Sequence, residues 1–154
     1  MTKLQVDCET NADVTRCKII GTLDEDFAPS LFSIPGRTVI FDFNLLSSMN
    51  SCGIRDWIKF IDTLKNKRVV YERCPRILVD QMNMIKGFLP KGSSIRSVYA
   101  PFFSATEEEE IDVLISMDGF NEEVLKKQRH PKTGAEIEFD DIPSQFFAFL
   151  KVIE

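Results

Sequence analysis

The sequence predicts an α/β fold, a mixed β-sheet with helices packed on it, followed by a small α+β extension. Three observations support this fold class. Residues 4–8 and 14–23 show the alternating apolar pattern of half-buried strands. The runs at 38–43 and 68–72 are rich in β-branched and aromatic residues, as in inner strands. Between these runs, apolar residues recur at the spacing of one helix face, so strands and helices alternate along the chain.

The chain is expected to open with a β-hairpin. In "LQVDC" and "VTRCKIIGTL" the apolar side chains fall on alternate positions, which are Leu4, Val6, Cys8, Cys17 and Ile19. The turn-prone "ETNAD" separates the two segments, which favours antiparallel pairing between them.

The next segments predict the centre of the sheet and its helices. "TVIFDF" follows "SIPGR" and is nearly continuous in apolar residues, as expected for a central strand covered on both faces. From Ile54 onwards the apolar residues share one helical face, and "KNK" ends this helix before the strand "RVVYE". A second helix is expected from Pro75, in its first turn, to the breakers Pro90 and Gly92. A strand near "SIRSVY" completes an α/β domain with right-handed crossovers.

We assign residues 1–100 to this α/β domain and residues 101–154 to an acidic C-terminal extension. Residues 1–103 hold 14 Lys and Arg against 11 Asp and Glu, whereas residues 104–154 hold 5 against 13. The extension is expected to contain two antiparallel strands around an acidic turn, a short helix in "NEEVLKKQ", a hairpin turn in "HPKTGAEIEF" and a final helix in "IPSQFFAFLKVI". The final helix is expected to dock on the rest of the protein through its apolar face, which is formed by Phe146, Phe149, Leu150 and Ile153.

Composition argues against several classes of protein. The apolar runs are far shorter than the roughly 20 residues needed to cross a bilayer, and the first residues do not resemble a secretory signal. We therefore expect a cytoplasmic protein with no membrane insertion. The net charge of −5 and the acidic extension disfavour nucleic-acid binding. The cysteines form no Cys-x-x-Cys pair and are expected to be reduced, buried thiols, namely Cys8, Cys17, Cys52 and Cys74.

The sequence holds few groups suited to catalysis. It lacks the glycine-rich phosphate-binding patterns and the Gly-x-Ser-x-Gly pattern, and His130 is its single histidine. Asp42, at the end of the central strand, is an isolated carboxylate and therefore weak evidence for a cation site. We expect a non-enzymatic protein that needs no cofactor.

Three stretches, in the same order, resemble a STAS domain, the fold of bacterial anti-sigma-factor antagonists and of the cytoplasmic tails of sulfate transporters. They are "IIGTLDEDFA", "VIFDFNLLSSMNSCGI" and "RVVYERCPRILVDQM". The family loop before the helix typically reads Met-Asp-Ser-Ser/Thr-Gly-Leu, and this chain reads Met49-Asn50-Ser51-Cys52-Gly53-Ile54. The resemblance implies a protein-protein interaction module whose partner is an anti-sigma factor or switch kinase. It places Ser51 on the serine that is phosphorylated in the family.

Three interpretations of Ser51 follow. A serine at a helix start can accept a hydrogen bond from a backbone N–H, and the loss of such a cap costs about 1 kcal/mol. Alternatively, the positive end of the helix dipole would tolerate a phosphate on Ser51, and the added charge would repel a partner that fits the unmodified loop. A third interpretation is partner contact without phosphorylation. Asn50 and Cys52 depart from the family pattern, which has an aspartate and a hydroxyl residue at these positions.

The expected partner-binding residues surround Ser51. Gly53 has no Cβ and would let a partner backbone approach closely. The acidic loop "DED" follows "IIGTL", where the family has an acidic loop at the same end of the sheet as the serine, so it is either part of a binding rim or a solvated turn. The complete set is Asp24, Asn50, Ser51, Cys52, Gly53 and Arg55.

Two alternative functions belong to other classes. An accessory STAS subunit of a transport or signalling complex would bind an ATPase constitutively through the same helix face. Asn50 and Cys52 slightly favour this alternative, because they weaken the match to the phosphosite. A small ligand, either a nucleotide or a lipid acyl chain, would instead occupy the crevice between sheet and helix.

The extension resembles a zinc ribbon that has lost its ligands. Ser104 and Glu107 are three residues apart, as are His130 and Thr133 in "HPKTG", in the outline of two zinc knuckles. Structural zinc takes about four thiolate, imidazole or carboxylate ligands. Of these four residues only Glu107 and His130 carry such a group, so we expect no metal here. His130 is expected at the surface near a helix end. Aromatic packing is expected to replace the metal, through Phe102, Phe103, Phe120, Phe139, Phe146 and Phe147.

Overall fold

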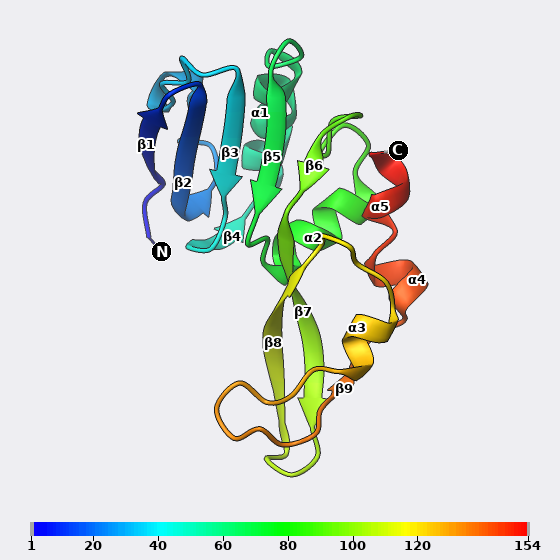
Figure 1. Cartoon of the computed structure of the whole chain (residues 1–154). Coiled ribbons are helices and arrows are strands. Elements are labelled where there is room, and N and C mark those ends of the chain that lie inside the picture. Colours follow the sequence, from blue (N-terminus) through cyan, green and yellow to red (C-terminus); the bar gives the residue numbers. More distant parts are fainter. Residues whose placement is uncertain (1, 154) are drawn as a thin grey trace.

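The structure, a computed structural model, describes residues 2–153. It is a mixed α/β fold with a six-stranded mixed sheet and a second, three-stranded sheet (Figure 1). The strands are β1 (Gln5–Asn11), β2 (Val14–Leu23), β3 (Thr38–Asp42), β4 (Leu46–Met49), β5 (Arg68–Glu72), β6 (Ser94–Ile95), β7 (Ser97–Ser104), β8 (Glu109–Ser116) and β9 (Glu138–Phe139). The helices are α1 (Ser51–Asp62), α2 (Arg76–Met84), α3 (Glu123–Lys126), α4 (Pro143–Phe146) and α5 (Phe149–Val152), with a 3-10 turn η1 (Pro29–Leu31).

The six-stranded sheet runs in the order β1-β2-β3-β5-β6. The opening hairpin is confirmed, because β1 pairs with β2 antiparallel. Its turn consists only of Ala12 and Asp13, which makes β1 longer than the sequence pattern indicated, whereas β2 has the predicted bounds. The pairs β2-β3, β3-β5 and β5-β6 are parallel. A strand that the sequence analysis missed, β4, pairs with the end of β2 just before α1 begins.

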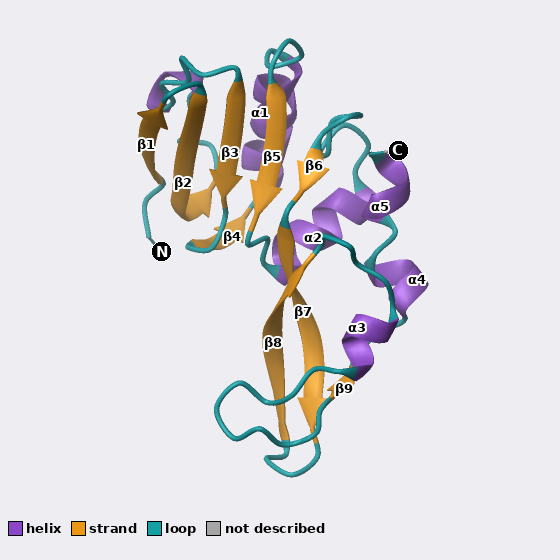
Figure 2. Ribbon diagram, in the orientation of Figure 1, coloured by secondary structure: helices purple, strands orange, loops and turns teal. Residues whose placement is uncertain are grey.

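Helix α1 covers one face of this sheet, and in the view of Figure 2 it lies behind β5. Trp57 is fully buried there, and its indole N–H donates to the hydroxyl of Tyr71 at 2.9 Å. The Tyr71 hydroxyl in turn donates to the carbonyl of Phe88 at 2.8 Å, so both buried polar groups are satisfied. The rings packed around Trp57 are those of Phe27, Phe32, Phe41, Phe43, Phe60 and Tyr71.

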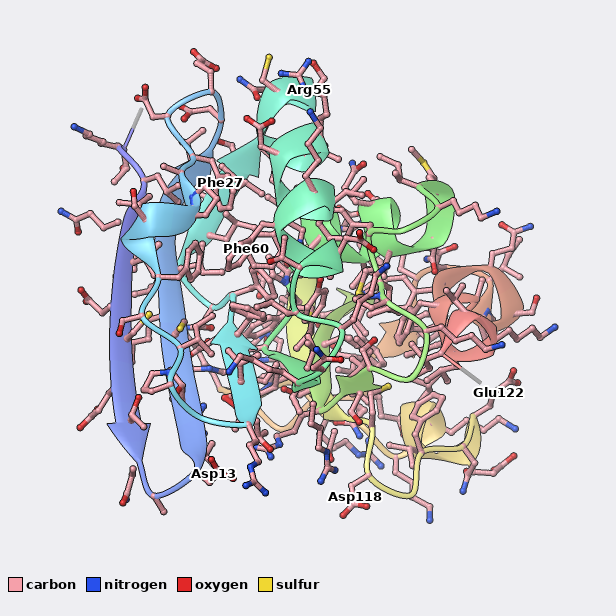
Figure 3. The ribbon with its side chains drawn as sticks, turned by 90° about the horizontal axis from the view of Figure 1, so that it is seen from above. Asp13, Phe27, Arg55, Phe60, Asp118 and Glu122 are labelled. Carbon is pink, nitrogen blue, oxygen red and sulfur yellow. The ribbon has the colours of Figure 1, made fainter. Side chains whose placement is uncertain are left out.

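Figure 3 shows the same arrangement from above, with Phe27 and Phe60 beside α1 and Arg55 pointing away from the sheet. The ring centroids of Phe27 and Phe60 are 5.6 Å apart in an edge-on contact. Aromatic rings favour such contacts over face-to-face stacking. The interior between α1 and the sheet is therefore an ordered aromatic cluster.

The central strand β3 is buried on both faces, as predicted, but the two faces are covered differently. Successive side chains alternate in direction, so Phe41 faces Trp57 while Ile40 and Asp42 face the opposite side. On that side Arg16 of β2 is directly opposite Ile40 and pairs with Glu72 of β5. The Arg16 stem must therefore cross β3, so that an ion-pairing side chain rather than a helix covers Ile40.

The second sheet grows out of the first. Only Arg96 separates β6, in the first sheet, from β7, the central strand of the second sheet, which has the order β8-β7-β9. Residue 100, the predicted domain boundary, lies inside β7. The predicted strands around the acidic turn are confirmed as the antiparallel pair β7-β8, which projects from the six-stranded sheet (Figure 1). The predicted short helix is confirmed as α3.

Two predicted helices differ from the structure. Helix α2 ends at Met84, because Ile85 is extended and Gly87 adopts a positive φ of 89°. The final helix is split into α4 and α5, because Phe147 leaves the helical conformation. Phe146, Phe147 and Phe149, on both sides of this break, are all buried. The segment docks as predicted, and the Asn83 side-chain amide donates to the Phe146 carbonyl at 2.9 Å.

The aromatic cluster of the extension is confirmed with one exception. Rings pack between β7, β9 and the last helices, and the closest pair is Phe120 and Phe147, with centroids 4.4 Å apart. The prediction for Phe103 was wrong. Its side chain is 40% exposed, because its neighbour Phe102 occupies the inward-facing position of β7.

Candidate functional site

The start of α1 is held against the end of β2 by backbone contacts. The Asn50 N–H donates to the Leu23 carbonyl at 3.0 Å, directly after the register that pairs Leu23 with Met49. Because β4 is paired with β2 up to this point, the segment before α1 is a strand end rather than a free loop. The helix therefore begins at a position that is fixed relative to the sheet.

The capping residue of α1 is Asn50, not Ser51. The Asn50 side-chain oxygen accepts from the Gly53 N–H at 2.9 Å, with the backbone extended as a cap requires. The interpretation of Ser51 as the cap was therefore wrong. Ser51 is the first helical residue, where a side chain points outward, and it is exposed. Within the described residues the Ser51 hydroxyl makes no hydrogen bond, and the cap is supplied by Asn50.

The other end of the Asn50 amide reaches the acidic loop. Its nitrogen donates to a carboxylate oxygen of Glu25 at 2.8 Å, and this hydrogen bond lowers the pKa of Glu25. The loop is ordered within itself, because the Asp24 carboxylate accepts from the Asp26 N–H at 3.0 Å. The acidic loop and the helix start, expected to lie at one end of the sheet, are therefore in direct contact.

Gly53 serves a different purpose from the one expected. A Cβ at this position would lie 2.2 Å from the Leu23 carbonyl oxygen and 2.6 Å from the Asp24 nitrogen. The backbone that approaches Gly53 is thus that of the same chain, not that of a partner. The glycine is buried, and it is required for the first turn of α1 to pack on the end of β2.

We define the α1-start surface as the accessible residues at this end of the sheet. Ser51 and Arg55 are exposed and lie four residues apart on one side of the helix. Asp24 and Cys52 are half-buried, and Glu25 is exposed. Of the six predicted partner-binding residues, the structure brings five to this surface, and Gly53 lies beneath it. Glu25 belongs to the surface as well, and its adjacency to Asn50 required the three-dimensional structure.

Asp42 is not a cation site. Its carboxylate is 2% exposed and accepts two hydrogen bonds from the guanidinium of Arg73, from Nε and from Nη2. This pairing raises the pKa of Arg73. Nearby, Glu72 pairs with both Arg16 and Arg96. Both carboxylates have their charge compensated by arginines, so neither is free to act as a metal ligand or a general base.

A half-open cleft of about 920 Å³ lies between the second half of α1 and the segment that follows α2. Its floor is apolar, with Ile61 and Leu64 from α1 and Leu89 from the segment after α2. Its rim is basic, formed by Lys59, Lys65, Lys86 and Lys91. Lys67 also lines the cleft, but its ammonium group donates to the carbonyls of Ile34 and Gly36. Among the lining residues that the structure describes, Asp62 is the one acidic residue, and it pairs with Lys65. Sequence reasoning missed this cleft because its lysines come from separate segments.

In the two turns compared with zinc knuckles, a side-chain oxygen or nitrogen accepts hydrogen bonds from backbone N–H groups. The Ser104 hydroxyl accepts from the Glu107 N–H at 3.2 Å, and His130 Nδ1 accepts from the N–H groups of Lys132 and Thr133 at 3.1 and 3.3 Å. His130 Nε2 lies 2.9 Å from the Glu109 carboxylate. The prediction of a surface histidine was wrong, because His130 is 6% exposed and sits in a hairpin turn. Residues 2–153 contain no cluster of three groups that could hold a metal.

Compared with protein-family models and with curated proteins, the sequence has no significant match. None of the helices between residues 2 and 153 has the length and apolar character needed to cross a bilayer. The assignment of a function therefore depends on the geometry of the sites above.

Proposed function

We propose that this chain is a STAS-like protein-protein interaction module that binds its partner through the α1-start surface. One observation carries the proposal. A single side chain, Asn50, caps the helix and holds Glu25 of the acidic loop, so the two segments form one ordered surface in the free protein. An ordered surface loses little conformational entropy on binding. The side chains of Ser51 and Arg55 are exposed on this surface, and neither side chain takes part in the hydrogen bonds of the helix cap.

By the STAS resemblance, the partner is an anti-sigma factor or switch kinase, and phosphorylation of Ser51 weakens the contact. A phosphate adds about 1.5 to 2 negative charges near neutral pH. It would stand at the positive end of α1, which favours it, and beside the carboxylates of the acidic loop, which oppose it. A partner that carries acidic groups against Arg55 would then be repelled.

The test uses each histidine-kinase-like switch kinase encoded in the same genome. The full chain is incubated with each kinase and ATP, phosphorylation is mapped by mass spectrometry, and complex formation is measured by pull-down. We expect phosphate on Ser51, with binding lost in Ser51→Asp and kept in the control Ser144→Asp, an exposed residue of α4. If no kinase modifies Ser51 and Ser51→Asp binds as well as the original protein, the switch is disproved.

A constitutive version of this function, as in an accessory subunit, makes a different prediction for the same surface. It is favoured by the acidic loop beside Ser51, which raises the electrostatic cost of a phosphate there. Arg55→Glu would then abolish the complex while the partner-bound protein carries no phosphate. Loss of binding in Arg55→Glu but not in Ser51→Asp would select this version.

The lysine-rimmed cleft favours a second candidate function, the binding of a small anionic ligand with an apolar part. An acyl chain would fit the apolar floor, and a carboxylate or phosphate head group would be neutralised by the rim. Native mass spectrometry of protein purified from cells would reveal a retained ligand. Lys59→Glu/Lys86→Glu should abolish the retained mass, whereas Lys127→Glu/Lys132→Glu, with the same change in net charge outside the cleft, should retain it. A mass equal to that of the bare chain would contradict this candidate.

A further inference from the structure

Two of the cysteines lie side by side across the opening hairpin. Cys8 of β1 and Cys17 of β2 are directly opposite each other in the antiparallel register. Their sulfur atoms are 2.7 Å apart, and both are thiols. Their separation in sequence hides this pairing, because no Cys-x-x-Cys pattern marks it. The prediction of buried thiols is confirmed for Cys17 and Cys74, and it was wrong for Cys8 and Cys52, which are half-buried.

The backbone at this pair already has the spacing of a disulfide. Directly opposite residues of antiparallel strands have Cα atoms roughly 4.5 to 5.5 Å apart. Disulfides span Cα distances of roughly 4.4 to 6.8 Å, so the bond needs only side-chain rotation. The remaining cysteines lie on other elements, Cys52 in the first turn of α1 and Cys74 after β5. The hairpin therefore selects one pair out of the four thiols.

The two thiols differ in accessibility, which sets the order of reaction. Cys8 lies on an edge strand and is half-buried, whereas Cys17 is fully buried. Burial, together with the neighbouring Cys8, raises the pKa of Cys17 far above that of a free thiol. Since the thiolate is the attacking species, Cys8 is the thiol that meets an external oxidant and Cys17 the one that resolves the intermediate.

We propose that Cys8 and Cys17 form a reversible intrachain disulfide when the protein meets a small-molecule disulfide such as glutathione disulfide. The Cys8 thiolate attacks one sulfur of the oxidant, which forms a mixed disulfide and releases one glutathione thiolate. Cys17 loses its proton to that thiolate and attacks the Cys8 sulfur, which breaks the mixed disulfide and releases the second glutathione. The protein loses two hydrogen atoms, and the oxidant is reduced to two thiols.

The disulfide would fasten the edge strand β1 to β2. β1 has a neighbour on one side only, and β2 ends at Leu23, directly before the acidic loop. A cross-link here restricts the unfolded chain and prevents β1 from separating. This inference is independent of the proposed partner, because the α1-start surface contains neither cysteine.

The test treats the reduced full chain with excess glutathione disulfide, followed by alkylation with N-ethylmaleimide, intact mass measurement and peptide mapping. Compared with the reduced and alkylated chain, we expect a product that carries two N-ethylmaleimide groups fewer and has lost two hydrogen atoms, a peptide linking Cys8 to Cys17, an unlinked Cys52, and complete reversal by dithiothreitol. Tm should rise by a few degrees on oxidation. Cys52→Ser should react in the same way, whereas Cys8→Ser should give no intrachain link.

Four outcomes would overturn the proposal. They are a persistent glutathione adduct on Cys8, a link that involves Cys52 or Cys74, a disulfide between two chains, and full alkylation of both hairpin thiols after the treatment. Cys8 is half-buried, so Cys8→Ser is expected to fold, and far-UV circular dichroism verifies this before the reaction is measured. The second variant Cys17→Ser replaces a fully buried group and is used only if it passes the same check.

Discussion

The body of the molecule, residues 2–96, and its extension, residues 97–153, both pack helices against a sheet, but the lengths of the helices differ. The body packs a twelve-residue amphipathic helix, α1, against a six-stranded sheet. The extension has only helices of four residues, α3, α4 and α5, against a sheet of three strands. Short helices contribute little stability by themselves. The extension must therefore be stabilised by its side chains, and its buried phenylalanines supply that stabilisation.

The two regions also share one hydrophobic core. The cluster of buried residues runs from Phe27 and Trp57 in the body through Leu78 of α2 to Phe146 and Phe149 in the extension. Helix α2 contacts both α4 and α5, and it is the element between the two aromatic groups. The comparison teaches that the extension, although it projects from the body, is coupled to it through α2.

The largest expected effect is in the body. Trp57→Ala removes a ring that is completely buried among six aromatic neighbours and leaves the Tyr71 hydroxyl without its donor. Removal of a buried tryptophan typically costs 3–5 kcal/mol, so we expect a loss of about 4 kcal/mol in the free energy of unfolding. Urea unfolding followed by far-UV circular dichroism measures it. Trp57→Phe should cost less than half as much, and equal losses would show that the aromatic packing does not decide stability.

The next effect tests the extension and its coupling. Phe147→Ala should cost about 3 kcal/mol, because the buried ring contacts Phe120, Phe139, Phe146 and Phe149. Trp57 is the single tryptophan, so its fluorescence reports on the body alone. If the core is shared, fluorescence and circular dichroism should shift to the same lower urea midpoint. A fluorescence midpoint that stays in place would show that the extension unfolds separately. Phe103→Ala, at the exposed position, is the control and should change stability by less than about 0.5 kcal/mol.

Local patterns predicted the elements of both regions, while contacts between distant segments escaped them. The strands β1, β2, β3 and β5 follow from alternation and apolar runs, which need only neighbouring residues. β4 is the exception, because "LSSM" has no strong strand pattern and becomes a strand by pairing with the end of β2. Tertiary pairing thus overrode weak local propensity.

The candidate site shows the same limit. The sequence located the loop-helix junction, yet the cap was assigned to Ser51 because a cap is recognised one residue at a time. Asn50 is also a good capping residue. In the structure its side-chain oxygen accepts from the Gly53 N–H, and its side-chain nitrogen donates to the Glu25 carboxylate. Likewise Gly53 was read as space for a partner, when the space is filled by Leu23. The Asn50 cap is a local contact with Gly53, whereas the contacts of Asn50 with Glu25 and of Gly53 with Leu23 join residues more than 20 positions apart.

The third prediction tests whether the turns of the extension keep a zinc-knuckle geometry. Ser104 is directly opposite Glu109 in the sheet, and Glu109 contacts His130, so the two turns lie at the same end of the hairpin. A variant with cysteine at Ser104, Glu107, His130 and Thr133 should bind one zinc ion. Zinc at 100 times the Kd would then stabilise the fold by about 2.7 kcal/mol.

Cobalt substitution checks this variant, because four thiolates give strong charge-transfer absorption. The control keeps Ser104 and Glu107 and changes only the other two positions, which leaves too few thiolates for a closed site. Absence of stoichiometric metal, or a Tm that does not respond to zinc, would contradict the knuckle geometry.

A smaller effect separates the two candidate caps of α1. Asn50→Ala should lower the free energy of unfolding by about 1 kcal/mol, because the Gly53 N–H loses its acceptor. Ser51→Ala should leave it within about 0.5 kcal/mol, because the Ser51 side chain is exposed and makes no cap. Parallel urea titrations measure both. A larger loss in Ser51→Ala than in Asn50→Ala would return the capping role to the serine.

The smallest effect is the pH dependence of the contact between the cap and the acidic loop. The Asn50 hydrogen bond lowers the pKa of Glu25 from its ordinary value of 4.5. A carboxylate with a lowered pKa in the folded state stabilises the fold above its unfolded pKa, and this contribution is lost as the pH falls through the folded value. Asn50→Asp keeps a capping oxygen but replaces the donor by a second carboxylate. We expect the Glu25 titration midpoint, followed by NMR of its side-chain carbonyl carbon, to rise in this variant, while Ser51→Ala leaves it unchanged. An unchanged midpoint in Asn50→Asp would mean that the acidic loop is not held by Asn50 in solution, and the α1-start surface would then not be ordered before a partner binds.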